Sequence, residues 1–580
     1  MAHLKSLLKG LRVDLGQADR SGRVGAFTRD EEGAMFNFAL LLFVAMLIVS
    51  GLSIDLMRTE LNRTRIQATM DRALLAAAHP DQESDRKGVV LDYFARSGLG
   101  NFIKAEDVTV EVGADGTRVT GRAHMNVSTP FLKAVGVHYL TAPASGGAAK
   151  INQLTEVSLV VDVSGSMDKL ATTGKTKIYE LRKAAKEFSN LLLCNPNDPT
   201  KATECTLTKR KTSISLVPYS TQVNVGSTVL SKFTRNDAQN IAYCATFEDA
   251  DFKETAVDPD VAIDQSAKFL RYGGNYKNNN GDAYLSCHTD SWREVVAFED
   301  SPTDMETKIN ALNASGDTAI DIGMKWGTAL LHHKAQPVVT SLIADQVVHG
   351  DFAGRPFNPA TTASSKFLVL MTDGQNTNHH HLFDGFRTGL SPFWLNTYND
   401  RDIMSVYRES SDSYQWFYPS TGETVWRPKP YGFQGANDCF PSRNGNKCTP
   451  YRTPENSITE QLTYEEFWAK KYTWGFLQRF DWLGAPGRKI SNSDDSDGDG
   501  TKDIDQRLLD QCKAAKDSGM TIYTIEMETP DTATDAMQKC ASVKGGERLH
   551  YKITQGDNSV NLSQVFSKIA EDINKLRLVN

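Results

Sequence analysis

The feature that most constrains this chain of 580 residues is an uncharged apolar segment near its start. Residues 33–54 read GAMFNFALLLFVAMLIVSGLSI, 22 residues without a charged side chain. As a helix this segment is about 33 Å long, enough to cross a hydrocarbon layer of roughly 30 Å. We therefore expect a transmembrane anchor. The alternative is a cleaved signal peptide, which the length of the stretch and the lack of a small-x-small cleavage site disfavour.

The orientation of this segment is read from the cysteines, because Lys and Arg residues are similar on its two flanks. All eight cysteines follow the segment, without a CxxC pair or zinc-like spacing: Cys194, Cys205, Cys244, Cys287, Cys439, Cys448, Cys512 and Cys540. We expect disulfides in an oxidising compartment and a cytoplasmic tail at residues 1–32. Pairing of neighbours is the simplest arrangement among 105 connectivities, and eight reduced thiols are the alternative.

The chain after the tail divides into three parts. Residues 33–80 keep one apolar edge past the membrane segment and predict a single membrane and stalk helix that ends at Pro80. Residues 81–150 contain alternating strand patterns and predict a small β-rich subdomain. From residue 153 onward, continuous apolar strands alternate with amphipathic helices, with strands at 157–163, 213–219, 366–372 and 520–527. This rhythm predicts an α/β domain, 153–580, with a doubly wound, mostly parallel sheet.

Two segments, 227–302 and 375–490, interrupt the rhythm and are rich in Asn, Gly, Pro and aromatic residues. We interpret both as loop-like insertions in one domain. Six of the eight tryptophans lie in the second: Trp394, Trp416, Trp426, Trp468, Trp474 and Trp482. Such residues can form a recognition surface or a small core of their own, and we favour the core, with one or two tryptophans exposed.

Oxygen-bearing side chains follow the predicted buried strands. Asp162, Ser164 and Ser166 form the sequence DVSGS where one strand ends, Asp373 follows another, and Thr318 lies in SGDTAIDIG. In open α/β sheets, ligands bind beyond the carboxyl ends of the strands. Hydroxyls and carboxylates are hard donors, which suit Mg²⁺, Mn²⁺ or Ca²⁺ and are poor for zinc or copper. A polar turn without a metal is the alternative.

DVSGS with a downstream Thr and a strand-terminal TDG resembles the metal-ion-dependent adhesion site (MIDAS) of the von Willebrand factor A family. The resemblance implies that Ser164, Ser166 and Thr318 coordinate Mg²⁺. It also implies that Asp162 and Asp373 hold the ion directly or through water. One coordination position would stay open for the carboxylate of a protein partner.

The N-terminal sequences FTRDEEGAMFNFALLLF and SIDLMRTELNRTRIQATMDRALLAAA resemble the TadE/TadG-like start of tight-adherence (Flp) pilus assembly proteins. IGMKWGTALL, VLMTDGQNT, SGMTIYTIEM and IAEDINKLRL resemble TadG-like members that carry an A domain. Relatives often have a glutamate just before the FAL triplet, where this chain has Asn37. That departure argues against pilin-type processing and packing into a filament.

Two weaker patterns involve possible ligands. Asp495, Asp497, Asp499, Thr501 and Asp503 are spaced as in a calcium loop, although Gln506 stands where an EF-hand has its closing glutamate. Calcium binding is one interpretation, and a solvated acidic loop before a helix is the other. His379, His380 and His381 are adjacent and cannot all face one ion, so we expect them in an exposed polar loop.

These patterns predict a membrane-anchored, metal-dependent protein-binding component of Flp pilus assembly or surface adhesion. Its expected location is the bacterial inner membrane, single-pass, with the bulk of the chain periplasmic or extracellular. Its partners would be pilus-assembly components or a surface ligand. A net charge of −7 without a basic stripe argues against nucleic acid.

Two alternatives stay open. One is a structural, minor-pilin-like subunit in which the metal only stabilises the fold. The other, which we favour least, is a secreted hydrolase. No Ser/His/Asp or Cys/His set has the context of a catalytic motif, so we expect no enzyme activity.

Overall fold

The structure is a computed structural model that divides into an N-terminal unit, Met1–Lys150, and a C-terminal unit, Ile151–Asn580. It describes residues 31–79, 85–113, 116–151, 154–271, 284–358, 364–398, 401–417, 422, 424–433, 438–441, 448–451, 458–491, 503–529, 534–556 and 560–579. The sequence places the end of the β-rich subdomain at the same boundary.

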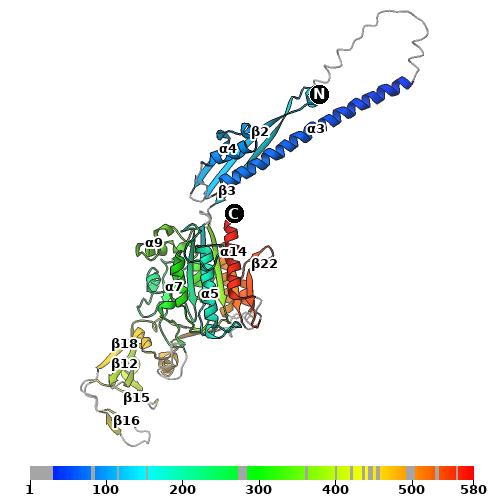
Figure 1. Ribbon diagram of the computed structural model, residues 1–580. Helices are drawn as coiled ribbons and strands as arrows, with labels where there is room; N and C mark the ends of the chain where they lie inside the picture. Colours follow the sequence, from blue (N-terminus) through cyan, green and yellow to red (C-terminus); the bar gives the residue numbers. More distant parts are fainter. Residues whose placement is uncertain are drawn as a thin grey trace, which may run out of the picture. The chain divides into compact units, whose positions relative to one another are not determined.

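The N-terminal unit combines one long helix with a small sheet. Helix α3 (Glu31–Ala77) is followed by α4 (Arg86–Arg96) and by the strands β1 (Val108–Gly113), β2 (Gly116–Ser128) and β3 (Tyr139–Ile151), in the order β1-β2-β3 (Figure 1). The second half of α3 packs on the sheet, with Met70 and Leu74 beside Gly121. Its first half exposes its apolar side chains, from Met35 to Ile54. By length and composition, α3 is able to cross a membrane.

The C-terminal unit is built on a six-stranded mixed sheet in the order β23-β20-β10-β4-β5-β9. Its strands are β4 (Leu154–Asp162), β5 (Thr212–Tyr219), β9 (Val296–Glu299), β10 (Ser364–Thr372), β20 (Thr521–Met527) and β23 (His550–Ile553). All neighbours are parallel except β5 and β9, which pair antiparallel at one edge. The central strands are buried along nearly their whole length, as the continuous apolar runs predict.

Helices cover both faces of this sheet (Figure 1). One face packs against α5 (Lys177–Leu193), α7 (Pro302–Ala311) and α14 (Leu562–Val579). The other packs against α8 (Ile320–Ala329), α9 (Gln336–Ala344), α12 (Asp503–Asp517) and α13 (Thr534–Cys540). The predicted combination of an apolar N-terminal helix with a mixed α/β architecture is confirmed.

The second insertion differs from the loop-like segment that we predicted. It contains a five-stranded sheet, β15-β14-β13-β12-β18, from β12 (Leu390–Tyr398), β13 (Arg401–Arg408), β14 (Ser413–Phe417), β15 (Thr424–Arg427) and β18 (Ile458–Thr463). Helices α10 (Tyr464–Ala469) and α11 (Trp474–Leu477) pack against it. Trp416 and Trp468 are each 1% exposed, whereas Trp426 is 40% exposed. The aromatic residues therefore build a core of their own, as we favoured.

Shorter elements complete the two insertions. The first insertion contains α6 (Ser227–Leu230) and a small sheet of β6 (Arg235–Asn236), β7 (Ala245–Thr246) and β8 (Ile263–Gln265). The second adds β11 (His379–Leu382), which pairs with β19 (Gly487–Ile490), and β16 (Asp438–Pro441), which pairs with β17 (Cys448–Tyr451). A hairpin of β21 (Val543–Lys544) and β22 (Glu547–Arg548) precedes β23.

Three disulfides join cysteines that are neighbours along the chain: Cys194–Cys205, Cys244–Cys287 and Cys512–Cys540. The prediction of disulfides is thus confirmed for these pairs. The side chains of Cys439 and Cys448 lie outside the described residues.

Helix α8 approaches the sheet at a glycine, and this contact predicts the effect of a substitution. A Cβ at Gly327 would collide with the Val160 side chain and lie 3.2 Å from Leu368 Cδ1. Gly327→Ala should therefore lower the free energy of unfolding by about 1–3 kcal/mol, since α8 must shift. Gly350→Ala, where a Cβ meets nothing within 4 Å, is the matched control. Urea titration followed by tryptophan fluorescence measures both, because all eight tryptophans lie in the C-terminal unit. Equal losses would contradict the prediction.

Candidate metal centre

The candidate site lies at the carboxyl end of the central sheet. Strand β4 ends at Asp162, and the turn after it, with the short 3₁₀-helix Gly165–Asp168, carries Ser164 and Ser166. Strand β10 ends one residue before Asp373. These two strands are parallel neighbours, with Met371 opposite Val161. Their carboxyl ends therefore meet. Thr318, in the loop just before α8, lies at the same edge.

The five predicted ligands form one cluster. Ser166 Oγ donates to Asp373 Oδ1 at 2.6 Å and lies 2.8 Å from Ser164 Oγ. Asp162 accepts the Ser164 backbone N–H through Oδ1 at 2.8 Å. Thr318 lies near the other members, beside Gly374. A Cβ built on Gly374 would lie 3.9 Å from Ser166 Oγ and 4.0 Å from Thr318 Oγ1. Four of the five line an open cleft of about 520 Å³, and Asp162 lies behind Ser164.

Both carboxylates of the cluster are buried, Asp162 fully and Asp373 at 3% exposed. Burial, and then the nearby charge of Asp373, raises the pKa of Asp162 to about 7. The Thr372 hydroxyl donates to Asp162 Oδ2 at 2.9 Å and partly offsets this effect. Two buried carboxylates at one strand edge are costly unless a cation or a proton neutralises them.

Lys177 supplies such a cation, and our sequence analysis missed it. Its Nζ lies 3.0 Å from Asp373 Oδ2, and the two side chains are 8% and 0% exposed. The same ammonium lies 3.4 Å from the backbone carbonyls of Met527 and Glu528. Lys177 is the first residue of α5, where a positive charge opposes the helix dipole. A lysine at that unfavourable position, the start of the first α-helix after DVSGS, was the available signal.

The residues present fit a hard divalent cation. Three hydroxyls and two carboxylates offer oxygen donors only, the set that Mg²⁺, Mn²⁺ and Ca²⁺ prefer. The Lys177 ammonium pairs with one carboxylate oxygen of Asp373, while the other oxygen faces Ser166. A bound divalent ion would therefore share Asp373 with a fixed ammonium.

The predicted calcium loop falls mostly outside the described residues. This applies to Asp495, Asp497, Asp499 and Thr501, whereas Asp503 is the first residue of α12. Calcium binding there stays a prediction.

The expectation of an exposed histidine loop is wrong. His379, His380 and His381 form most of strand β11 and are 1%, 6% and 4% exposed. Pairing with β19 and the aromatic core of the insertion cover them, with the His380 and Trp474 rings 5.3 Å apart. Burial lowers the pKa of His380 to about 4 and also lowers the pKa of His381 well below its ordinary value. Among the described residues, no group of three or more His, Cys, Asp or Glu side chains is arranged to hold a metal.

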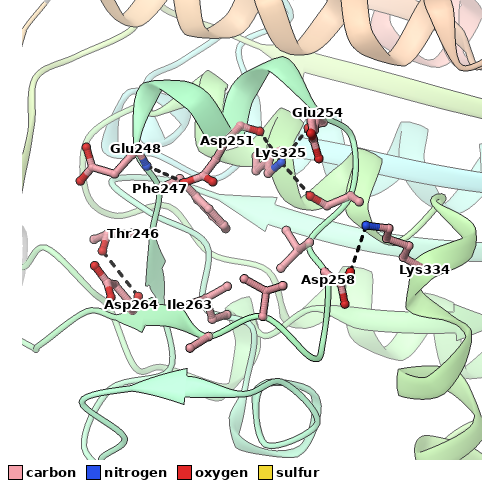
Figure 2. A pocket seen from close by; sticks show the side chains of 14 residues that line it. Thr246, Phe247, Glu248, Asp251, Glu254, Asp258, Ile263, Asp264, Lys325 and Lys334 are labelled. Atoms are coloured by element: carbon pink, nitrogen blue, oxygen red, sulfur yellow. Dashed lines mark hydrogen bonds and ion pairs between the residues drawn. The ribbon is translucent and has the colours of Figure 1, made fainter.

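A second cavity, of about 320 Å³, lies in the first insertion (Figure 2). Its Lys325 ammonium points at the loop and donates to the backbone carbonyls of Glu254 and Ala256 at 2.7 and 3.0 Å. Lys334 pairs with Asp258 at 3.0 Å (Figure 2). Burial lowers the pKa of Lys325 to about 8. Both lysines bind groups of the protein itself, so we assign this cavity a structural role.

Comparisons with known proteins identify only the N-terminal helix. Residues 33–79 match the family model described as "Putative Flp pilus-assembly TadE/G-like". No curated protein matches the chain. The PilB minor pilin from Streptococcus sanguinis is 11% identical with a TM-score of 0.26, over 81% of this chain and 77% of that one. A point mutant of that pilin is 12% identical with the same TM-score, over 81% and 78%.

A similarity that weak defines neither fold nor function. The match to the family model, by contrast, confirms the TadE/TadG-like resemblance for residues 33–79. The von Willebrand factor A resemblance gains no support from the comparisons and stays a prediction.

The raised pKa of Asp162 predicts how stability depends on pH. Without divalent ions, the folded state holds the Asp162 proton more tightly than the unfolded state does. That stabilisation is complete below pH 3.8 and is lost as the pH rises through about 7, a fall of roughly 2–4 kcal/mol in unfolding free energy. Urea titrations in EDTA from pH 4 to 8 measure it. Asp162→Asn should flatten the profile, and an unchanged slope in this variant would contradict the assignment.

The Lys177–Asp373 pair predicts opposite effects on stability and on cation binding. Lys177→Met removes the ammonium that neutralises Asp373, so the metal-free protein should lose roughly 3 kcal/mol of unfolding free energy. The same change should raise Mg²⁺ affinity about tenfold, because the ion no longer meets a fixed positive charge. Urea titration and calorimetry measure the two quantities. Lys334→Met, which breaks the pair with Asp258, should change neither appreciably.

Proposed function

We propose that this chain is a membrane-anchored component of Flp or tight-adherence pilus assembly, or of surface adhesion, that binds a protein partner through a divalent cation. The cation is Mg²⁺, with Mn²⁺ or Ca²⁺ as substitutes, and its ligands are Asp162, Ser164, Ser166, Thr318 and Asp373. The observation that carries the proposal is the clustering of these five side chains, four of which line one cleft. A carboxylate of the partner completes the coordination shell.

The topology of the sheet supports this proposal. Numbered along the chain, the six strands run 3-2-1-4-5-6 across the sheet, with strand 3, β9, antiparallel. That order is the doubly wound one, in which the crevice for ligands opens beside the first strand. The first strand is β4, which ends at Asp162. Both the strand order and the position of the site agree with a von Willebrand factor A-type fold.

The surroundings of the cleft suit a carboxylate ligand. Lys169 is exposed at the rim, and Leu170 beside it is 66% exposed. The buried ammonium of Lys177 adds positive charge below them. The carboxylates Asp317, Asp373 and Glu528 line the same cleft, so the attraction for an acidic side chain would come mainly from a bound divalent cation in this partly dry site. No histidine or cysteine is among the described residues that line the cleft, which favours binding over catalysis.

The N-terminal unit supports the membrane and pilus parts of the proposal. Residues 33–79 match the pilus-assembly family model, and α3 exposes an apolar surface long enough to span a bilayer. Three disulfides suit an oxidising compartment. We therefore place α3 in the bacterial inner membrane, with the C-terminal unit on its periplasmic or extracellular side.

A second candidate function is a structural, minor-pilin-like subunit, which the same helix match favours. In that case the cation would only stabilise the C-terminal unit. Partner contacts would come from α3, so exchanging residues 1–80 would abolish function while changes at Asp162 would not.

The proposal predicts cation-dependent capture of a partner. Full-length protein from membranes should retain partner proteins in Mg²⁺ and release them in EDTA. The double variant Asp162→Ala, Ser164→Ala should lose capture more than tenfold, since a lost carboxylate ligand costs more than about 1.4 kcal/mol. Quantitative pull-down measures the retained proteins.

The matched control is Asp258→Asn, which removes a carboxylate charge far from the cleft and should leave capture unchanged. Calorimetry of the same variants reports Mg²⁺ binding separately. Capture that survives both EDTA and the double variant rejects the cation-bridged mechanism. Mg²⁺ binding with cation-independent capture would favour the structural subunit.

A further inference from the structure

The turn between β2 and β3, residues 129–138, exposes an unusual amount of apolar surface. We call this turn, together with Tyr139 at the start of β3, the hairpin tip. It contains the 3₁₀-helix Leu132–Val135 and reads TPFLKAVGVHY. Phe131 is 50% exposed, Val135 64%, Val137 39% and Tyr139 59%. Turns between strands are normally polar, and a contiguous apolar patch on such a turn marks an interaction surface.

The hairpin tip is fixed to helix α3. Asp55 Oδ2 accepts the backbone N–H groups of Phe131 at 3.0 Å and Leu132 at 2.7 Å. The Asp55 carboxylate is thereby 1% exposed. One turn earlier, a Cβ at Gly51 would lie 2.6 Å from Phe131 Cδ1, so the ring packs directly on the helix backbone. The tip therefore has a fixed position along α3.

That position is the end of the apolar segment of α3. The exposed apolar side chains of the helix begin at Met35, and Asp55 is the first charged residue after them. From Met35 to Ile54 the helix rises about 30 Å, the thickness of a hydrocarbon core. The Phe131 ring touches α3 at Gly51, inside the last turn of this segment. With α3 in a bilayer, the tip lies at the boundary between acyl chains and headgroups.

We propose that the hairpin tip is a second membrane-binding element, which inserts Phe131, Val135 and Val137 into the leaflet where α3 leaves the bilayer. This inference rests on the proposed membrane anchoring. The apolar surface of the tip continues that of the helix. Lys133 and Tyr139 add a cation and a phenol, which are common at headgroup level. The two backbone bonds to Asp55 keep its carboxylate away from lipid.

The arrangement suits lipid better than a second copy of the chain. A second copy of the chain could cover the tip at any position along α3. A tip that binds lipid must lie at the end of the membrane-spanning segment. The contact at Gly51 and Asp55 places it there. Together, helix and tip attach the N-terminal unit at two points and fix the rotation of α3 about its axis.

Fluorescence quenching by brominated lipid tests the inference on the full chain. The protein is placed at one copy per nanodisc of phosphatidylethanolamine and phosphatidylglycerol, with bromine on the upper acyl chain. A single tryptophan is added by Val135→Trp, and the parent spectrum, from eight tryptophans in the C-terminal unit, is subtracted. The added emission should fall by about half, since interfacial elements lie roughly 5–10 Å deep. Arg118→Trp, exposed at the far end of β2, is the matched control and should not be quenched.

A third variant separates this inference from the membrane anchor. Leu41→Trp, on the exposed apolar face of α3, is quenched if the helix spans the bilayer. Quenching at both Leu41→Trp and Val135→Trp supports the inference. Quenching at Leu41→Trp alone overturns it and leaves the anchor standing. If Val135→Trp is shielded only when two copies share a nanodisc, the tip binds another chain and the inference is wrong. Absence of quenching at Leu41→Trp rejects the anchor itself.

Discussion

Parallel strands that end at one edge of a covered sheet force distant parts of the chain to meet, and the candidate site depends on this constraint. Asp162 and Asp373 are separated by 211 positions, yet they follow neighbouring strands whose register is fixed along eight residue pairs. Helix α8 presents Thr318 to the same edge because its glycines allow a close approach to the sheet. The second insertion adds a core of its own. The first insertion packs into the main core and supplies the edge strand β9, so the expectation of a loop-like segment at 227–302 is wrong there.

The electrostatic cost of the site is partly offset within the protein itself. Two carboxylates share a buried edge, and Lys177 lies against one of them. Lys177 thus neutralises part of the buried negative charge within the chain itself. If the proposed divalent ion binds, the same lysine would limit how strongly it is held. In the proposed function, moderate affinity of this kind would let the cation concentration control partner binding, because a site saturated under all conditions cannot respond.

Much of the fold and most of the site could be predicted from the sequence, for identifiable reasons. The runs around Val157–Asp162 and Phe367–Thr372 are buried on both faces, so their apolar continuity identified them as strands. The candidate ligand residues, whose role stays a prediction, were chosen from strand ends and motif spacing. Lys177 was missed because a lysine on a helix is normally solvated, and only the three-dimensional position of Asp373 shows its partner.

The histidine strand and the second insertion were misjudged for a related reason. His379–His381 read as polar, yet pairing with β19 and the Trp474 ring bury them. Burial of this kind comes from tertiary contacts about a hundred residues away, which no local pattern contains.

One consequence concerns mechanical force. Strand β4 is joined to β3 through only two residues, since Ile151 ends one strand and Leu154 begins the next. A pull on the Asp162 carboxylate therefore travels down the covalent backbone of β4 and into β3 without first crossing the rest of the C-terminal unit. Within β4, pairing with β10 and β5 flanks this path from Leu154 to Asp162. Tension between Asp162 and β3 would thus act first on the covalent backbone of β4. The rest of the C-terminal unit would carry little of that force.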